Sequence, residues 1–241
     1  MASSTTNRPD EGAAPGGKPT VESAVEHLVS AVKPHLRGWI HLGMTPLVLA
    51  AGITLIALAP TPAARWSSVV FAVATTLLFG MSALYHRGHW SARTLAVLRR
   101  IDHSNIFIVI AGTYTPLAVL LLPQRTAVTL LTIVWSGAIV GILMRVFWLS
   151  APRWLYVPIY VALGWAAVWF LPQFYAAGGA AVMWLVIAGG LAYTGGAVVY
   201  ALKRPNPSPR WFGFHEIFHV GTLLGYTCHT VAIFITVLNY S

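Results

Sequence analysis

Long apolar runs dominate the chain from Ile40 onward, and short polar or basic stretches separate them. Each run covers about 17 to 25 residues, and about 20 helical residues are needed to cross the hydrocarbon core of a bilayer. The uninterrupted runs at 117–122 and 180–191 do not alternate as the strands of a membrane β-barrel must. The pattern therefore predicts an all-α, polytopic membrane bundle.

We assign seven transmembrane helices to these runs. They cover residues 40–59, 67–86, 102–122, 126–147, 154–171, 180–201 and 216–238. Residues 40–241 together make up the predicted seven-helix membrane domain.

Two segments of different character precede the first span. Residues 1–19 are rich in Ser, Thr, Pro and Gly, which predicts a disordered cytoplasmic tail. Residues 20–39 are predicted to form a short amphipathic helix on the inner membrane interface, and a partly ordered linker is the alternative. The apolar residues with helical spacing in this segment are Val21, Val25, Leu28, Val29 and Val32.

Composition agrees with a membrane protein. Of the 241 residues, 57% are hydrophobic and 9% are charged, whereas soluble domains carry about 25% charged residues. The net charge of +9 comes from basic residues scattered over short loops, so no nucleic-acid partner is expected. The single cysteine, Cys228, excludes an intrachain disulfide and a cysteine-rich metal site. Any metal must therefore be bound by His, Asp or Glu.

The distribution of Lys and Arg predicts the orientation. If the N-terminus is cytoplasmic, thirteen of the fifteen basic residues lie on the inner side, as the positive-inside rule requires. The thirteen are Arg8, Lys18, Lys33, Arg37, Arg87, Arg93, Arg99, Arg100, Arg145, Arg153, Lys203, Arg204 and Arg210. Only Arg65 and Arg125 remain outside. We expect a multi-pass protein of the cell membrane with a cytoplasmic N-terminus and an external C-terminus.

Acidic residues are scarce in the predicted membrane domain, where only Asp102 and Glu216 occur. An ionisable group at membrane depth costs about 2.5 to 3.5 kcal/mol on insertion scales, so it is a functional candidate by default. Each of the two carboxylates lies beside histidines in the sequence. They therefore mark the regions in which chemistry is expected.

Two motifs at span ends combine histidine with other polar residues. The second span ends Ser82-Ala-Leu-Tyr-His86, and the seventh begins His215-Glu216-Ile-Phe-His219. A spacing of four residues places both side chains of each motif on one helix face. His-Glu-x-x-His is also the zinc signature of many metalloproteases, in which the glutamate is the general base. Without its context, the histidine pair is explained equally well by ordinary packing and by metal binding.

The predicted orientation places these polar residues in one leaflet. They are Ser82, His86, Asp102, His215 and His219. Three neutral imidazoles leave a fourth tetrahedral position open for water, which is the pattern of a catalytic zinc. Because carboxylates are scarce and thiolates absent, Zn²⁺ is the leading metal. The sequence therefore predicts a zinc site near the cytoplasmic face.

The remaining histidines are expected to be non-catalytic. Those in or near interfacial segments are His27, His35, His41 and His89. His103 points about 100° away from its neighbour Asp102 on an ideal helix, so it is expected to be a neighbour rather than a ligand. His229 lies about 15 Å beyond His219, which favours an interhelical hydrogen bond and leaves a proton relay as the alternative.

Four ordered motifs within residues 33–238 carry a family resemblance. They are LRGWIHLGMTP, SALYHR, IDHSNIFIVIAGTYTP and GFHEIFHVGTLLGYTCH. The chain resembles the hemolysin III proteins, within the wider group of progestin and adiponectin receptor-like (PAQR) membrane proteins. The resemblance implies that His86, His215 and His219 bind the metal, with Ser82 and Asp102 beside it. The same superfamily includes alkaline ceramidases, which look like zinc amidases acting on lipids.

Two classes of function follow. The first is a zinc-dependent hydrolase of an amide or ester bond in a lipid that enters sideways from the bilayer. Asp102 or Glu216 would accept the proton, and Ser82 would orient the site. The alternative is a pore-forming, cytolytic, channel or transport protein that affects membrane energetics, with zinc structural only. Membrane lipids are the expected partners, and the oligomeric state is left open.

Overall fold

The computed structural model describes residues 34–240. The predicted tail, 1–19, and residues 20–33 of the predicted interfacial helix lie outside the described residues. Of the described residues of that predicted segment, 35–38 form a turn and Trp39 begins the first described helix. Gly38 ends the turn with a left-handed φ of 82°, which glycine adopts without steric strain.

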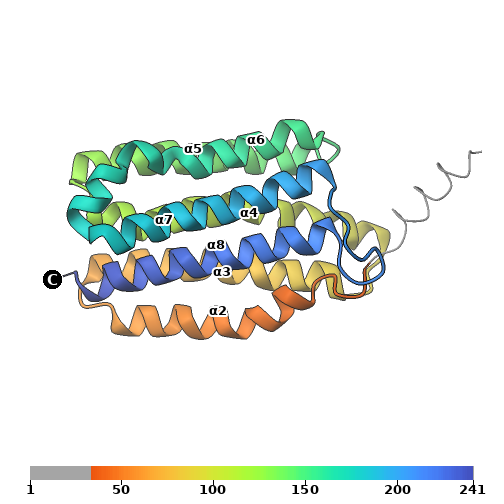
Figure 1. Ribbon diagram of the computed structural model, residues 1–241, viewed down its shortest axis with the longest axis horizontal. Coiled ribbons are helices and arrows are strands. Elements are labelled where there is room, and N and C mark those ends of the chain that lie inside the picture. The colour runs from red at the N-terminus through yellow and green to blue at the C-terminus, as the bar shows by residue number, and fades with distance from the viewer. Residues whose placement is uncertain (1–33, 241) are drawn as a thin grey trace, which may run out of the picture. The chain divides into compact units, whose positions relative to one another are not determined.

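The described residues form helices and no β-strand, as the sequence predicts. Figure 1 shows the helices lying side by side along one axis. They are α2 (Trp39–Leu58), α3 (Pro62–Arg87), α4 (Ala92–Leu121), α5 (Gln124–Phe147), α6 (Arg153–Gly164), α7 (Leu171–Leu202) and α8 (Phe214–Leu238). A short 3-10 helix, η1 (Trp165–Phe170), joins α6 to α7.

Six helical segments in the described chain are long and apolar enough to cross a membrane. One of them, Arg153–Leu202, is 50 residues long and contains both the fifth and the sixth predicted spans. Its helical geometry breaks at Gly179, where φ is 79° and ψ is 176°. This break lies inside α7, and Figure 1 shows α6 and the greater part of α7 running side by side.

The start of α4 is set by a cap that lies outside the apolar run. The Ser91 side chain accepts a hydrogen bond from the backbone N–H of Thr94, at 3.3 Å, and α4 begins at Ala92. The predicted third span began only at residue 102. Hydrophobicity alone does not detect the polar first turns of a helix, whose start is marked by its N-cap. Asp102 consequently lies well inside a helix rather than at its first turn.

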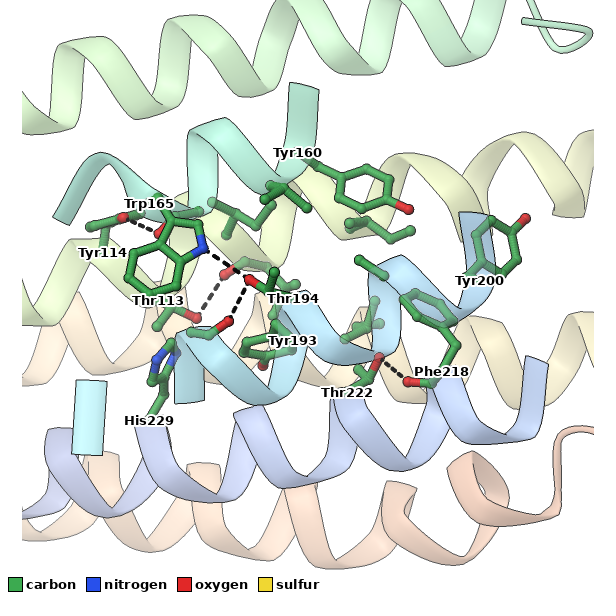
Figure 2. A pocket seen from close by; sticks show the side chains of 18 of the residues that line it. Thr113, Tyr114, Tyr160, Trp165, Tyr193, Thr194, Tyr200, Phe218, Thr222 and His229 are labelled. Carbon is green, nitrogen blue, oxygen red and sulfur yellow. Dashed lines mark hydrogen bonds between the residues drawn. The ribbon is translucent and has the colours of Figure 1, made fainter. Parts of the chain in front are cut away.

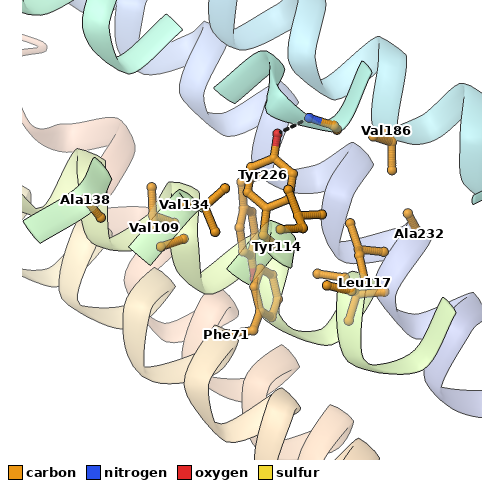
Figure 3. Packing of buried hydrophobic residues seen from close by; sticks show 14 of the residues in the cluster. Phe71, Val109, Tyr114, Leu117, Val134, Ala138, Val186, Tyr226 and Ala232 are labelled. Carbon is orange, nitrogen blue, oxygen red and sulfur yellow. Dashed lines mark hydrogen bonds between the residues drawn. The ribbon is translucent and has the colours of Figure 1, made fainter. Parts of the chain in front are cut away.

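Tyr114 stabilises the interruption between α6 and α7. Its hydroxyl donates to the Gly164 carbonyl at 2.6 Å and accepts from the Ala167 N–H at 2.7 Å. Backbone polar groups at membrane depth need internal partners, because lipid supplies none. Figure 3 shows Tyr114 among buried apolar side chains, including Phe71 and Leu117, with this hydrogen bond to the neighbouring backbone.

Close packing of α7 on α8 relies on two glycines. A Cβ placed on Gly221 would lie 2.9 Å from the Gly196 Cα, a distance that real Cβ atoms essentially never show. Small residues allow such approaches between membrane helices. The contact fixes the first turns of α8, which carry His215 and His219, against the bundle.

Candidate metal centre

Three histidines meet at the end of the bundle where α3 finishes and α8 begins. His86 lies in the last turn of α3, and His215 and His219 lie in the first turns of α8. One ligand nitrogen from each lies within 4.8 Å of the other two. His86 and His219 are buried and His215 is half-buried. These three residues, called here the three-histidine centre, are the three predicted metal ligands.

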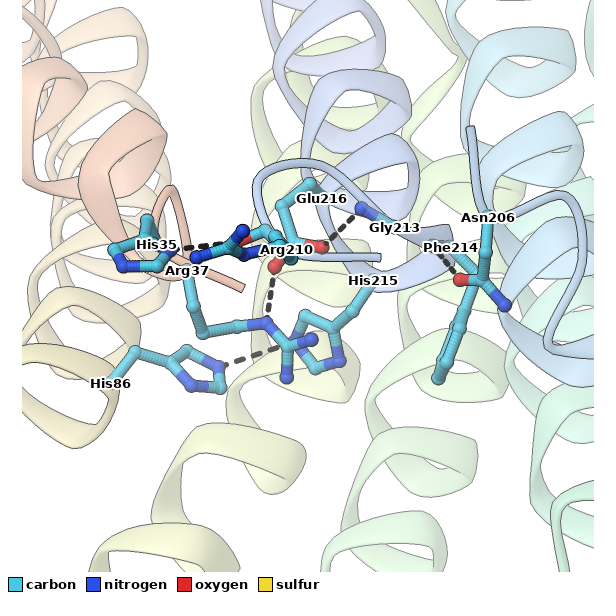
Figure 4. Close-up of polar contacts among 9 residues, drawn as sticks. All are labelled: His35, Arg37, His86, Asn206, Arg210, Gly213, Phe214, His215 and Glu216. Atoms are coloured by element: carbon cyan, nitrogen blue, oxygen red, sulfur yellow. Dashed lines mark hydrogen bonds and ion pairs between the residues drawn. The ribbon is translucent and has the colours of Figure 1, made fainter. Parts of the chain in front are cut away.

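The geometry of the centre fits a metal ion. The Nε2 atoms of His86 and His215 are 3.2 Å apart (Figure 4). Two nitrogens bound tetrahedrally to zinc at about 2.0 to 2.1 Å lie about 3.3 Å from each other. In addition, Nδ1 of the buried His219 has no hydrogen-bond partner among the described residues. The centre can therefore hold a metal ion with three imidazole ligands.

Ser82 and Asp102 lie beside the centre on neighbouring helices. Ser82 is buried one turn before His86 on α3. Its hydroxyl is within hydrogen-bonding reach of the Asp102 carboxylate on α4. Both side chains line the same cavity as His215 and His219. Four of the six predicted site residues thus line one cavity, and a fifth, His86, meets two of them in the three-histidine centre.

Glu216, the sixth predicted site residue, faces a different set of partners. Its side chain is fully buried, and Oε2 accepts a hydrogen bond from the Gly213 N–H at 2.8 Å. Oε1 forms an ion pair with Arg37 (Figure 4). A carboxylate at this position satisfies a free N–H in the first turn of α8. Glu216 is not among the residues that line the cavity.

The turn before α2 packs against the outer side of the centre. The N–H groups of His35 and Leu36 donate to the carbonyls of Arg210 and Trp211, at 2.9 and 3.3 Å. A Cβ on Gly38 would lie 2.6 Å from the His86 Cβ. The Arg37–Glu216 pair therefore belongs to a layer of backbone and side-chain contacts that covers the end of the centre.

His41 is a neighbour of the centre that the sequence analysis assigned to the interface. Its ring stacks on that of His219, with centroids 3.8 Å apart and planes 15° from parallel. The side chain is buried, and neither ring nitrogen has a hydrogen-bond partner among the described residues. The Lys and Arg distribution also places the start of the first span at this end of the bundle, so His41 could have been predicted as a neighbour of the centre.

Two further histidines lie where the sequence predicted. His103 donates from Nδ1 to the Arg99 carbonyl at 2.8 Å and lies 3.6 Å from the Asp102 carboxylate, outside the three-histidine centre. Nε2 of His229 donates to the Val186 carbonyl at 3.1 Å. The predicted interhelical hydrogen bond of His229 is confirmed.

A long cavity extends from the centre into the bundle. It reaches from His215 and Asp102 to His229 and Leu171. Its walls are mainly apolar, and polar groups reappear at the far end, where the Trp165 Nε1–H donates to the Thr194 hydroxyl at 2.9 Å (Figure 2). A narrow apolar ligand with one polar end would match this distribution.

Comparison with known proteins gives consistent matches. A family model described as haemolysin-III related matches residues 29–230. The Hemolysin-3 homolog of Bacillus subtilis (strain 168) is 33% identical over 172 residues, which cover 70% of this chain and 80% of that protein. Hemolysin-3 of Bacillus cereus is 30% identical over 144 residues, which cover 60% of this chain and 65% of that protein.

Proposed function

The chain belongs to the hemolysin III family of membrane proteins, and from that premise we propose that it is a zinc-dependent hydrolase of membrane lipids. The bond cleaved is an amide or an ester. The observation that carries the proposal is that Ser82, Asp102, His215 and His219 open onto one mainly apolar cavity, with His86 completing the ligand set.

The proposed ligands of Zn²⁺ are His86, His215 and His219. The donor set of three imidazoles is typical of catalytic zinc, which keeps one position open. When bound, the ion would supply Lewis acidity and make a water molecule nucleophilic near neutral pH.

Asp102 is the proposed proton acceptor. Its carboxylate lines the cavity, whereas both oxygens of Glu216 are occupied by Gly213 and Arg37. Asp102 would take a proton as the water oxygen bonds to the carbonyl carbon, and then return it to the amine or alcohol as the carbon–nitrogen or carbon–oxygen bond breaks. Ser82 would orient the Asp102 carboxylate through its hydroxyl.

The apolar walls support a lipid substrate. Side chains such as Ile106, Val109 and Leu117 would contact an acyl chain and exclude water from it. A substrate of this kind would enter sideways from the bilayer. We further propose seven membrane crossings, because Arg153–Leu202 is twice the length that one crossing requires and its helical geometry breaks at Gly179.

The proposed location is the cell membrane, with a cytoplasmic N-terminus and an external C-terminus. In this orientation thirteen Lys and Arg residues lie on the cytoplasmic side and two on the outside, as the positive-inside rule requires. The three-histidine centre would then lie near the cytoplasmic face.

Cytolysis is the second candidate function, suggested by the names of the Bacillus relatives. A wide aqueous pore requires polar faces along several helices. In the described residues the long cavity is instead walled mainly by apolar side chains. We rank hydrolysis first for this reason.

Lipid turnover by purified protein tests the proposal. We expect wild-type protein to release fatty acid from a mixture of amide-linked and ester-linked bilayer lipids, and His215→Ala to release none. His89→Ala is the matched control, because His89 is an exposed histidine at the same end of the bundle. Turnover that survives in His215→Ala, or its absence in zinc-loaded wild-type protein, would contradict the proposal.

A further inference from the structure

A second pocket, the basic pocket, lies at the same end of the bundle. It lies between the start of α4, the loop from α5 to α6 and the end of α7. Four cationic side chains line it: Arg99, Arg145, Arg153 and Lys203. None of these residues belongs to the proposed zinc site.

Arg145 is buried in the wall of the basic pocket. Only 1% of the residue is exposed, and Nε and Nη1 have no hydrogen-bond partner among the described residues. Its guanidinium lies 4.3 Å from the centre of the Tyr156 ring, a contact that holds the charge without neutralising it. Burying a guanidinium is unfavourable unless hydrogen-bond acceptors or an opposite charge compensate it. The unfilled donors of Arg145 therefore call for an anion.

The protein supplies no such anion in the described part of the chain. Asp102 and Glu216 are its only acidic residues, and neither lines the basic pocket. Glu216 pairs with Arg37, and the Asp102 carboxylate lies 3.6 Å from Nδ1 of His103. The four cationic side chains consequently line the basic pocket with no carboxylate among them.

The surroundings of the basic pocket indicate where its ligand comes from. Trp154 lines the pocket and is 74% exposed, and Phe147 and Trp148 are exposed at the end of α5. Exposed aromatic residues at helix ends are typical of the membrane–water interface, where lipid headgroups lie. Guanidinium groups bind phosphate through paired hydrogen bonds.

We propose that the basic pocket binds the phosphate of an anionic phospholipid. Arg145 would donate to the phosphate from inside the bundle, and Arg99 and Lys203 would contact it from the exposed rim. Such pockets between transmembrane helices are a recurrent way of binding anionic lipid headgroups. The site does not depend on the zinc chemistry proposed for the three-histidine centre.

Lipid binding to the full chain in detergent tests this proposal. Native mass spectrometry would follow titration with phosphatidylglycerol and with phosphatidylcholine of the same acyl chains. We expect one phosphatidylglycerol per chain, held at least tenfold more tightly than phosphatidylcholine. Inorganic phosphate at millimolar concentration should not displace it.

Two rim substitutions and one control locate the site. Arg99→Ala and Lys203→Ala are exposed positions that should fold normally, and each should weaken phosphatidylglycerol binding about fivefold. Arg145→Gln should weaken it more. Arg93→Ala, an exposed arginine in the first turn of α4 outside the pocket, should leave the affinity within about twofold. Zinc content should be unchanged in all four variants, which separates this test from that of the hydrolase.

Three results would overturn the proposal. Equal affinity for the two lipids would remove the requirement for an anion. An equal loss in Arg93→Ala would show a diffuse charge effect instead of a pocket. Displacement of the lipid by millimolar inorganic phosphate would identify free phosphate, rather than a lipid, as the ligand.

Discussion

The two carboxylates of the membrane domain lie beside the three-histidine centre and have different surroundings. Asp102, called here the inner carboxylate, faces the long cavity inside the bundle and has the Ser82 hydroxyl within reach. Glu216, called here the outer carboxylate, does not line that cavity and is enclosed by Arg37 and the start of α8. The carboxylate next to His215 in the sequence is thus held by structural contacts, while the one on another helix is open to the cavity.

Replacing the inner carboxylate should have the largest effect on the reaction. Asp102→Asn keeps the side-chain shape and removes the proton acceptor, so we expect the turnover rate to fall by about 10² to 10⁴. Zinc content should remain that of the wild type. Rate measurements with metal analysis on one preparation check both outcomes, and a near-normal rate in Asp102→Asn would assign the base to another group.

Breaking the outer pair should affect stability more than turnover. Arg37→Ala leaves the Glu216 carboxylate buried without its partner, which is expected to cost about 3 kcal/mol of folding free energy. Thermal unfolding in detergent would reveal this loss as a lower Tm. Arg210→Ala is the control, because Arg210 contributes only its backbone carbonyl to the same layer. A larger loss of turnover than in Asp102→Asn would reverse the assignment of the two carboxylates.

Removal of the Ser82 hydroxyl tests how the inner carboxylate is oriented. We expect Ser82→Ala to lower the turnover rate by about 10- to 100-fold, the range found when a group supporting a metal site is lost. Ser67→Ala, a buried serine elsewhere on α3, is the matched control. If the two variants retain equal rates, Ser82 has no part in orienting Asp102.

The smallest expected effect concerns His41, whose ring stacks on that of His219. Its stacking on His219 is worth about 0.5 to 1.5 kcal/mol, so His41→Ala should weaken zinc binding roughly twofold to tenfold. His41→Phe restores an aromatic ring and should recover the affinity. Zinc titration against a competing chelator measures both, and failure of Phe to restore binding would point to a role for the ring nitrogens.

Sequence patterns predicted which histidines meet at the centre, but they did not predict the contacts of the carboxylates beside it. The i, i+4 spacing of His215 and His219 and the basic-residue bias were enough to predict that three histidines meet at one end. The partner of Glu216 was not predictable, because Arg37 lies 179 residues away and no local pattern joins them. The position of Glu216 three residues after Gly213 is the one local sign of a capping role.

The sequence also predicted only part of the fold. Apolar runs predicted every helix core, because hydrophobicity decides which segments enter a bilayer. They did not predict that α4 begins at Ala92 or that Arg153–Leu202 forms one segment broken at Gly179. Caps and backbone breaks depend on single residues and on tertiary contacts such as those of Tyr114, which a hydropathy average does not detect.

The zinc content of purified protein tests the central claim most directly. Metal analysis should find one zinc per chain in wild-type protein and in His89→Ala, and none in His86→Ala that retains its helical circular dichroism. Well-folded wild-type protein that binds no zinc when the ion is supplied, or His86→Ala that binds as much as the wild type, would contradict the assignment of the three-histidine centre.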